Sequence, residues 1–246
     1  MNLFDCTAGF GTYRTRVFRF ARTAAELIEE LDFCGIERAL VYHTAQRFDA
    51  PASGNEIILQ EIKGYERLVP TWTILPSHTG ELPPLATLLQ EMSQHGVRAL
   101  RLFPEDHRYL LDEVTWGDQM AVLMKRRIPL FIKASLDKIG HLLSVFPELV
   151  VITGTQGSNP LDRYAWPLIE RYSHLHFETA GYLVDGIIEV FCRRYGAGRL
   201  LFSSGFPDHA SGAALLMLAH AGISEDERQA IAGDNLARLL AEAQLP

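Results

Sequence analysis

The sequence predicts a single-domain α/β protein, a (β/α)8 TIM barrel. Short apolar runs rich in β-forming residues alternate with longer amphipathic stretches, which is typical of a parallel sheet with crossover helices. The 246-residue chain contains eight such runs, and no Pro-rich or Gly/Ser-rich linker separates them. An open doubly wound sheet has roughly five to seven strands, so the number favours a closed barrel.

The predicted strands share an apolar core and a polar residue near the carboxyl end. In chain order they are NLFDC (2–6), RALVYH (38–43), RLVPTWTIL (67–75), VRALRLF (97–103), IPLFIK (128–133), LVVIT (149–153), LHFET (175–179) and RLLFSS (199–204). No GxGxxG motif follows a strand and no P-loop is present, so a nucleotide-binding sheet has no support.

The helices are predicted from apolar periodicity and from their end signals. The first follows Thr23-Ala-Ala-Glu26, a capping box, and stops near Gly35. The next are expected at 54–63, 84–95, 115–126, 136–146, 160–171, 184–195 and 210–219. Ser224-Glu-Asp-Glu227 opens a further helix, and a last one ends near Ala243. We therefore expect one domain over residues 1–246, with helices in 224–243 packing on the barrel.

Composition excludes several classes of partner. The net charge is −7 and Lys and Arg form no basic tract, so the sequence predicts no nucleic-acid partner. No apolar stretch approaches the roughly 20 residues that span a bilayer, and the first residues read as a strand, which predicts a cytoplasmic protein without a membrane partner. The expected partner is a small-molecule substrate, and a homodimer would fit so apolar a barrel.

The candidate site lies at the carboxyl ends of the strands, where barrel enzymes place their chemistry. The residues there are Asp5, Cys6, Thr7, His43, Thr71, Trp72, Thr73, Arg101, His107, Lys133, Thr153, Thr155, Glu178, Thr179, Ser203, Ser204 and His209.

Four segments resemble the amidohydrolase-related branch of the amidohydrolase superfamily. They are FDCTAGFG, GVRALRLFP, YGAGRLLFSSGFP and the tail ISEDERQAIAGDNLARLL, and together they extend the likeness over nearly the whole chain. The resemblance implies a TIM-like barrel and membership of a group that includes hydrolases, decarboxylases and lactonases.

The same comparison of motifs implies that the usual metal site is missing. Metal-binding members carry Asp-x-His-x-His after the first strand, whereas this chain has Asp5, Thr7 and Gly9. The fifth-strand histidine falls on Lys133, and the aspartate of the usual Gly-Ser-Asp falls on Gly205. Zinc needs three or four N, O or S ligands, which the matching positions do not supply. We therefore predict no ordinary metal ligands, while a divalent metal such as zinc on a rearranged set stays open.

Two cations are the leading substrate-binding candidates. Arg101 lies between two leucines on a buried strand, and a guanidinium there needs an anionic partner, either a substrate carboxylate or Asp5. Lys133 shares a strand face with Phe131, and it binds either a substrate carboxylate or a carboxylate of the chain, Glu178 or Asp5.

The catalytic candidates are carboxylates and histidines. Glu178 can act as a general base or satisfy backbone N–H groups of the next helix. Asp5 can take part in chemistry or anchor the first loop, and His43 and His209 can transfer protons or lie on the surface. The remaining substrate-binding candidates are Thr7, Trp72, Ser203 and Ser204; neither serine lies in a GxSxG nucleophile motif.

Three functions are compatible with these residues. The first is an amidohydrolase-like hydrolase, of lactonase, amide or ester hydrolase, or related decarboxylase type, acting on a small carboxylated substrate without the usual metal. The second is a metal-dependent hydrolase whose ligands come from Asp5, Cys6, His43, Glu178 or His209. The third is an inactive barrel that serves as a binding or scaffold protein, since one fold hosts many functions.

Overall fold

The parallel strands form one closed barrel. The computed structural model describes residues 1–14, 17–154, 163–181 and 184–246. The strands are β1 (Phe4–Phe10), β2 (Arg38–His43), β3 (Leu68–Pro70), β4 (Trp72–Thr73), β5 (Leu100–Leu102), β6 (Leu130–Ile132), β7 (Val151–Gly154), β8 (Leu175–Glu178) and β9 (Leu200–Leu201). They pair in parallel in the order β1-β2-β3 and β4-β5-β6-β7-β8-β9. The predicted α/β barrel is confirmed.

Backbone hydrogen bonds join the two groups of strands. At the first junction the Thr71 amide donates to Val41 O, and the next amide, Trp72 N, donates to Ala99 O. The third predicted strand therefore changes partners at Thr71 and appears as β3 and β4, directly after Pro70, which has no N–H to donate. At the second junction Cys6 N donates to Phe202 O at 2.9 Å, which closes the barrel.

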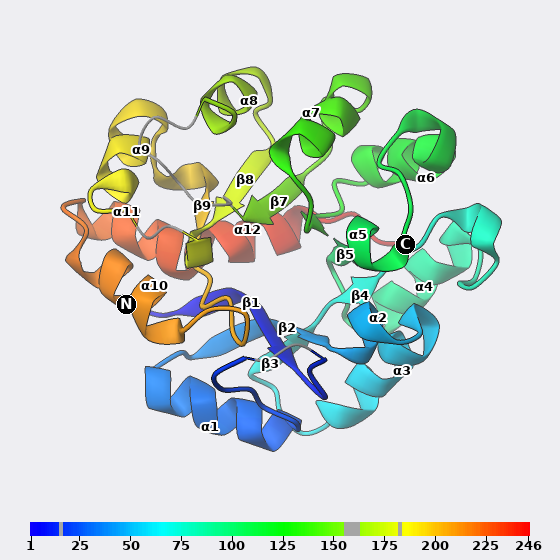
Figure 1. Ribbon diagram of the computed structural model, residues 1–246, viewed down its shortest axis with the longest axis horizontal. Helices are drawn as coiled ribbons and strands as arrows, with labels where there is room; N and C mark the ends of the chain where they lie inside the picture. Colours follow the sequence, from blue (N-terminus) through cyan, green and yellow to red (C-terminus); the bar gives the residue numbers. More distant parts are fainter. Residues whose placement is uncertain (15–16, 155–162, 182–183) are drawn as a thin grey trace.

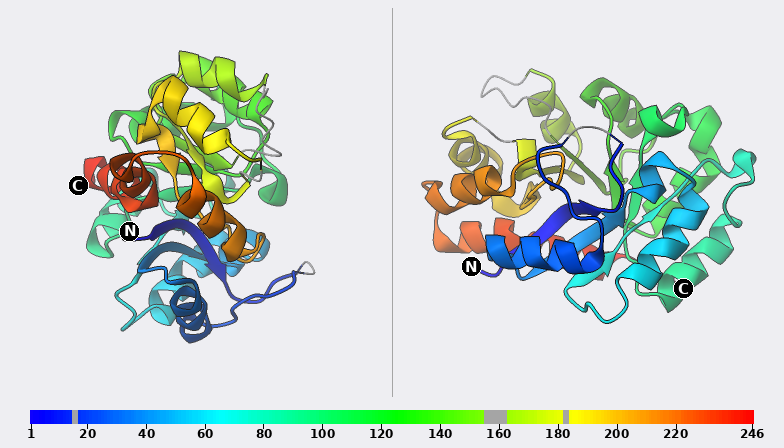
Figure 2. Two further views of the ribbon diagram at one scale, coloured as in Figure 1. Left: turned by 90° about the vertical axis from the view of Figure 1, so that its left-hand side faces the viewer. Right: turned by 60° about the horizontal axis from the view of Figure 1, so that its bottom comes forward.

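Helices surround the strands, as Figures 1 and 2 show. They are α1 (Ala24–Cys34), α2 (Ala45–Phe48), α3 (Pro51–Glu61), α4 (Leu85–Gln94), α5 (Pro104–His107), α6 (Glu113–Lys125), α7 (Leu136–Val145), α8 (Ala165–Arg171), α9 (Ile187–Tyr195), α10 (Ser211–His220), α11 (Glu225–Gln229) and α12 (Asn235–Glu242). The sequence did not indicate α2 and α5, because a four-residue helix is too short to show periodicity. Thr155 and the start of the helix expected at 160–171 lie outside the described residues.

Both predicted N-caps are present, but only one is a complete capping box. Ser224 Oγ accepts from Glu227 N, and the Glu227 carboxylate accepts from Ser224 N at 2.9 Å. Thr23 caps Glu26 N at 3.2 Å, whereas the Glu26 carboxylate accepts from Arg22 N one residue earlier. The prediction of a complete capping box at Thr23 is therefore wrong: the Glu26 carboxylate accepts from the Arg22 amide and not from the Thr23 amide.

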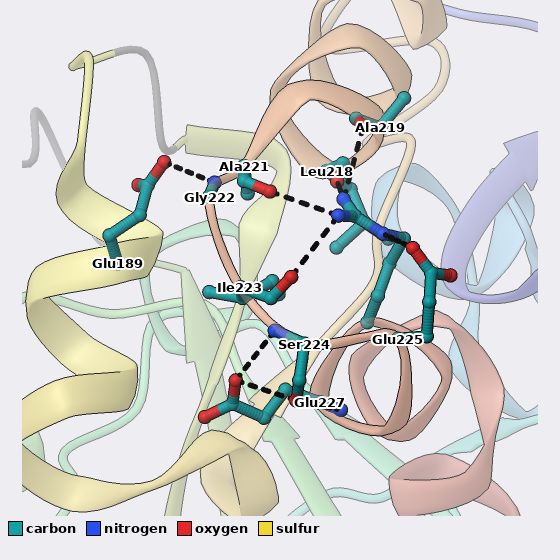
Figure 3. Close-up of polar contacts among 10 residues, drawn as sticks. Glu189, Leu218, Ala219, Ala221, Gly222, Ile223, Ser224, Glu225 and Glu227 are labelled. Atoms are coloured by element: carbon teal, nitrogen blue, oxygen red, sulfur yellow. Dashed lines mark hydrogen bonds and ion pairs between the residues drawn. The ribbon is translucent and has the colours of Figure 1, made fainter.

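Polar contacts hold the C-terminal helices against α10 and against the barrel. Figure 3 shows the end of α10, where the Arg228 guanidinium of α11 donates to carbonyls that the helix leaves unpaired, among them Ala221 O at 3.0 Å. On α12, Asn235 Nδ2 donates to Ala197 O and Leu200 O, each at 2.9 Å. These contacts hold the tail ISEDERQAIAGDNLARLL against the end of α10 and against β9.

The barrel has an apolar interior that α12 closes at the amino ends of the strands. Alternation places one set of residues toward the helices and the other inside the barrel. The interior cluster comprises Phe4, Cys6, Leu40, Ala99, Phe131, Val150, Ile152, Leu201, Leu236, Leu239 and Leu240, the last three from α12. Among the described residues, α12 fills this end, and the cavity lies toward the carboxyl ends of the strands.

Candidate functional site

A cavity of about 520 Å³ lies at the carboxyl ends of the strands. Its walls are largely apolar and aromatic, with a few charged side chains, which is the usual character of a small-molecule site. The lining residues are Thr7, Tyr42, Arg101, Phe103, Phe131, Ile132, Lys133, Ala134, Ile152, Thr153, Gly154, Glu178, Gly181, Val184, Gly205, Asp208 and His209. The cavity therefore brings together six of the residues predicted at the carboxyl ends of the strands: Thr7, Arg101, Lys133, Thr153, Glu178 and His209.

Arg101 is a buried cation without a carboxylate partner among the described residues. Its side chain, on β5, is only 3% exposed. Nε donates to Thr71 Oγ1 at 2.8 Å and Nη2 to Cys6 O at 3.2 Å, both neutral acceptors. The guanidinium also lies over the Tyr42 and Phe131 rings, at 4.9 and 4.6 Å from their centroids. The salt bridge to Asp5 that the sequence allowed is not formed.

Burial dominates the electrostatics of Arg101. Removal from water lowers the pKa of its guanidinium, although a group with so high an ordinary pKa stays charged. Hydrogen bonds and aromatic faces compensate the desolvation of a cation only in part. The carboxylates of Glu178 and Asp5 act against this lowering of the pKa without forming an ion pair, so Arg101 remains a cation with which a bound anion could pair.

Glu178, at the end of β8, points into the cavity. Alternation places its neighbour Phe177 in the helix-facing core, where it packs edge-on against Phe191 of α9. The Glu178 carboxylate has no ion pair among the described residues, and its contact there is the Cys6 thiol at 3.9 Å. Gly154 leaves room for it, since a Cβ at that position would lie 2.9 Å from Glu178 Oε1. Glu178 therefore faces the interior of the barrel and not the surrounding helices.

Lys133 stands at the rim of the cavity and is paired with the chain itself. Its side chain is 48% exposed, and Nζ donates to Asp208 Oδ2. Neither carboxylate named as its alternative partner, Glu178 or Asp5, makes this contact. Burial raises the pKa of Asp208, but Lys133, Tyr13 and Arg47 outweigh that effect and hold the pKa below its ordinary value.

Asp5 and the two serines form a buried network beneath the cavity rather than part of its wall. Asp5 accepts from Thr7 N and Ser204 N, each at 3.0 Å, and from the Ser204 hydroxyl. Burial raises its pKa to about 7 despite these bonds. Ser203 Oγ accepts from Gly205 N at 3.1 Å. The hydroxyls at the end of RLLFSS thus fix the turn that carries Gly205 and anchor it to the first strand.

The two histidines named as catalytic candidates are separated. His43, at the end of β2, lies outside the cavity, where its Nδ1 accepts from Ala45 N at 3.2 Å and its ring contacts Phe10 edge-on. Burial lowers its pKa. His209, in contrast, lines the cavity. Trp72 lies in the helix-facing core and does not line the cavity.

Tyr42 and Asp208 are cavity residues that the sequence analysis missed. Tyr42 precedes His43 and shares the inward phase of β2 with Leu40, so strict alternation could have selected it over the histidine. Asp208 precedes His209 in a loop, where no periodicity applies. Its role depends on contacts with Tyr13, Lys133 and Arg47, which are far away in sequence.

The residues at the expected ligand positions do not fit a metal. A side chain on Gly9 would place its Cβ 2.5 Å from Tyr42 Cζ, and one on Gly205, where φ is +64°, would lie 2.6 Å from the Ala180 Cβ. A histidine or aspartate therefore cannot enter either position without rearranging its neighbours. The described residues bring together no three His, Cys, Asp or Glu side chains that could hold an ion.

The interior also contains a histidine that takes no part in the cavity. His176, on β8 beside Ile152 of β7, is buried, and neither ring nitrogen has a partner among the described residues. Burial lowers its pKa to about 3. Protonation of this buried imidazole at low pH would therefore destabilise the folded protein.

We expect His176→Leu to stabilise the protein most at acidic pH. The unfolded histidine takes up a proton near pH 6.5 and the folded one only near pH 3, so folded wild-type protein loses stability as pH falls through this window. The loss is about 1.4 kcal/mol per pH unit, or about 2 kcal/mol between pH 6.5 and 5.

Urea unfolding of both proteins at pH 7.5 and 5 measures this effect. Asp5 acts in the opposite direction, because its raised pKa favours the folded state as pH falls from 7 to 4. Both proteins contain Asp5, so its contribution cancels in the difference between them. An equal advantage of the variant at both pH values would contradict the assignment.

Comparison with known proteins shows which solved structures share this fold. No protein-family model matches the sequence, and no curated protein matches it either. Solved structures match over almost their whole length. A 5-carboxyvanillate decarboxylase from Sphingomonas paucimobilis is 13% identical, with a TM-score of 0.77 and coverage of 98% of this chain and 99% of that one.

Two further structures are similar to the same degree. A dihydroxybenzoic acid decarboxylase from Polaromonas sp. JS666, with bound manganese and the inhibitor 2-nitroresorcinol, is 15% identical (TM-score 0.77; 98% and 97% covered). A probable 2-pyrone-4,6-dicarboxylic acid hydrolase from Acinetobacter baumannii, with citric acid bound, is also 15% identical (TM-score 0.73; 98% and 100% covered). The predicted resemblance to amidohydrolase-related TIM barrels is thus confirmed for the fold. No helix among the described residues is long and apolar enough to cross a membrane.

Proposed function

We propose that this chain is an amidohydrolase-like enzyme that acts on a small carboxylated molecule without the usual metal site. The reaction is hydrolysis of a lactone, ester or amide, or a related decarboxylation. The observation that carries the proposal is Arg101, a buried guanidinium in the cavity wall with no carboxylate partner among the described residues.

A substrate carboxylate is the natural partner of Arg101. The planar guanidinium offers several donors in a fixed geometry that matches a carboxylate, and Nε and Nη2 are already held by Thr71 and Cys6 O. The stacked rings of Tyr42 and Phe131 restrict the guanidinium further. An anion binding to the remaining donors would therefore meet a preorganised site.

Glu178 is the group placed to move a proton. As a general base it would take a proton from water while the water oxygen attacks the substrate carbonyl, and it would return the proton to the leaving oxygen or nitrogen. Its carboxylate is free of ion pairs among the described residues, so it is available for this exchange. His209, on the same cavity wall, is a second group able to exchange protons with the leaving atom.

The proteins with a similar fold support the reaction class and not its details. They include a decarboxylase of 5-carboxyvanillate and a probable hydrolase of 2-pyrone-4,6-dicarboxylic acid, which is a lactone, and both substrates are carboxylated. Another of these proteins binds manganese, whereas this chain has Thr7, Gly9, Lys133 and Gly205 at the expected ligand positions. No step of the proposed reaction runs through a metal.

The proposal is tested by combining metal analysis with a turnover screen. Protein purified without chelator should contain less than about a tenth of a transition metal per chain. The same preparation should turn over at least one compound in a panel of carboxylated lactones, esters, amides and hydroxybenzoates. A stoichiometric metal that activity requires would favour the rearranged metal site, and ligand binding without turnover of any compound would favour a binding protein.

A further inference from the structure

The rim of the cavity is held by one carboxylate, that of Asp208. The residue follows β9 and its side chain lines the cavity. Oδ1 accepts from the Tyr13 hydroxyl, and Oδ2 accepts from Lys133 Nζ and, at 3.4 Å, from Arg47 Nη1. One acidic side chain therefore joins three segments of the chain around the opening.

These contacts leave the rim without an unpaired positive charge among the described residues. Lys133 is paired with Asp208, and Arg47 is shared between Asp208 and Asp106, whose Oδ2 lies 2.7 Å from Arg47 Nε. The two formal positive charges at the rim are balanced by two formal negative ones. Deeper in the cavity, Arg101 has no such partner.

The charges that face a ligand differ in how they are paired. Two carboxylates, Glu178 and Asp208, and two cations, Arg101 and Lys133, line the cavity. Lys133 is paired with Asp208, whereas Arg101 forms no ion pair with a carboxylate of the described chain. One carboxylate of a ligand can bind Arg101. A second would lie toward the rim, where its natural partner Lys133 is already occupied and where Asp208 repels it.

We propose that Asp208 restricts the site to ligands with a single carboxylate and an uncharged body. This inference rests on the proposed function, since it takes Arg101 as the site of the first carboxylate. The body of the ligand lies against Tyr42, Phe103 and Phe131, and the Lys133–Asp208 pair excludes a second negative charge. Asp208 is thus a specificity-determining residue, and Asn at this position keeps the shape and removes the charge.

Binding of two probes that differ by one carboxylate tests the inference. Benzoate and isophthalate are titrated calorimetrically, at one pH and ionic strength, into wild-type protein, Asp208→Asn and the control Asp32→Asn. In the wild type we expect benzoate to bind about tenfold or more tightly than isophthalate. Asp208→Asn should bind isophthalate about tenfold more tightly than the wild type does and leave the benzoate Kd within about threefold. Asp32→Asn should keep the wild-type ratio, because Asp32 is an exposed residue of α1 that pairs with Arg67 and does not line the cavity.

Several outcomes would overturn the inference while leaving the proposed function intact. The first is an unchanged isophthalate-to-benzoate ratio in Asp208→Asn, and the second is an equal change in Asp32→Asn. A third is loss of both ligands in a folded Asp208→Asn, which would assign Asp208 a role in positioning Lys133. If wild-type protein binds neither probe, carboxylate binding itself is wrong and both proposals fall.

A second variant should change the preference for benzoate over isophthalate in the opposite direction. It also tests the inference if Asp208→Asn does not fold. Lys133→Met leaves the Asp208 charge without its ammonium partner, so repulsion of a second carboxylate increases. The preference for benzoate over isophthalate should then exceed that of the wild type. A smaller preference would overturn the inference independently of the first variant.

Discussion

Glu178→Gln is expected to lower kcat by about a hundredfold to ten-thousandfold, the usual contribution of a positioned general acid or base. Glutamine keeps the size and hydrogen-bonding shape of the side chain but cannot accept a proton in turnover. Ligand binding should stay within about threefold of the wild type, because the carboxylate-binding group, Arg101, is on another strand.

Steady-state kinetics on the substrate found in the screen, together with a binding titration, separate these two quantities. Glu170→Gln is the matched control, since Glu170 is an exposed residue of α8 that pairs with Arg194 and lies outside the cavity. A wild-type kcat in Glu178→Gln would show that another group moves the proton, and His209 would be examined next. A parallel loss of binding and turnover would indicate a structural role.

Arg101→Met is expected to raise the Kd of benzoate by about a hundredfold or more. Truncating one partner of a buried charge pair costs about 2–5 kcal/mol, and the methionine side chain retains much of the apolar contact with Tyr42 and Phe131. We expect the folded protein to be at least as stable as the wild type, because the variant no longer buries a cation that has only neutral partners.

The matched control for Arg101→Met is Arg98→Met, three residues earlier in the chain. The Arg98 guanidinium donates to two backbone carbonyls of the C-terminal segment. Nε donates to Leu240 O, and Nη2 donates to Ala243 O at 2.9 Å. Its removal should lower the midpoint of urea unfolding without changing the benzoate Kd. Undiminished affinity in a folded Arg101→Met would contradict the proposed carboxylate site.

Together the variants divide the site into binding, chemistry and selectivity. In the proposed function Arg101 binds the carboxylate and Glu178 transfers the proton, and in the further inference Asp208 rejects a second negative charge. Buried groups with a functional purpose commonly reduce the stability of the fold, and Arg101 has that character here. His176 reduces stability without a ligand-facing role, which is why its substitution should stabilise the protein.

The inward positions on the strands could be predicted in part, because alternation is a local property. It placed Lys133 on the same strand face as Phe131, and both residues line the cavity; the same rule selects Tyr42 over His43 once the phase of β2 is known. Loop residues have no period, so nothing in the sequence connected Asp208 with Tyr13, Arg47 and Lys133. Likewise, the burial of Asp5 and Ser204 in one network depends on the contact between the first and last strands.

By itself the sequence determined the barrel, its capped C-terminal helices and the identity of the side chains at the expected ligand positions, since periodicity, end signals and residue type are local. Only the tertiary structure decided which charges are paired. Arg101 is left with neutral acceptors, whereas Lys133 is paired with Asp208. The physical reason is that an ion pair depends on the separation of two side chains in space, and barrel closure brings together residues that are far apart in the chain.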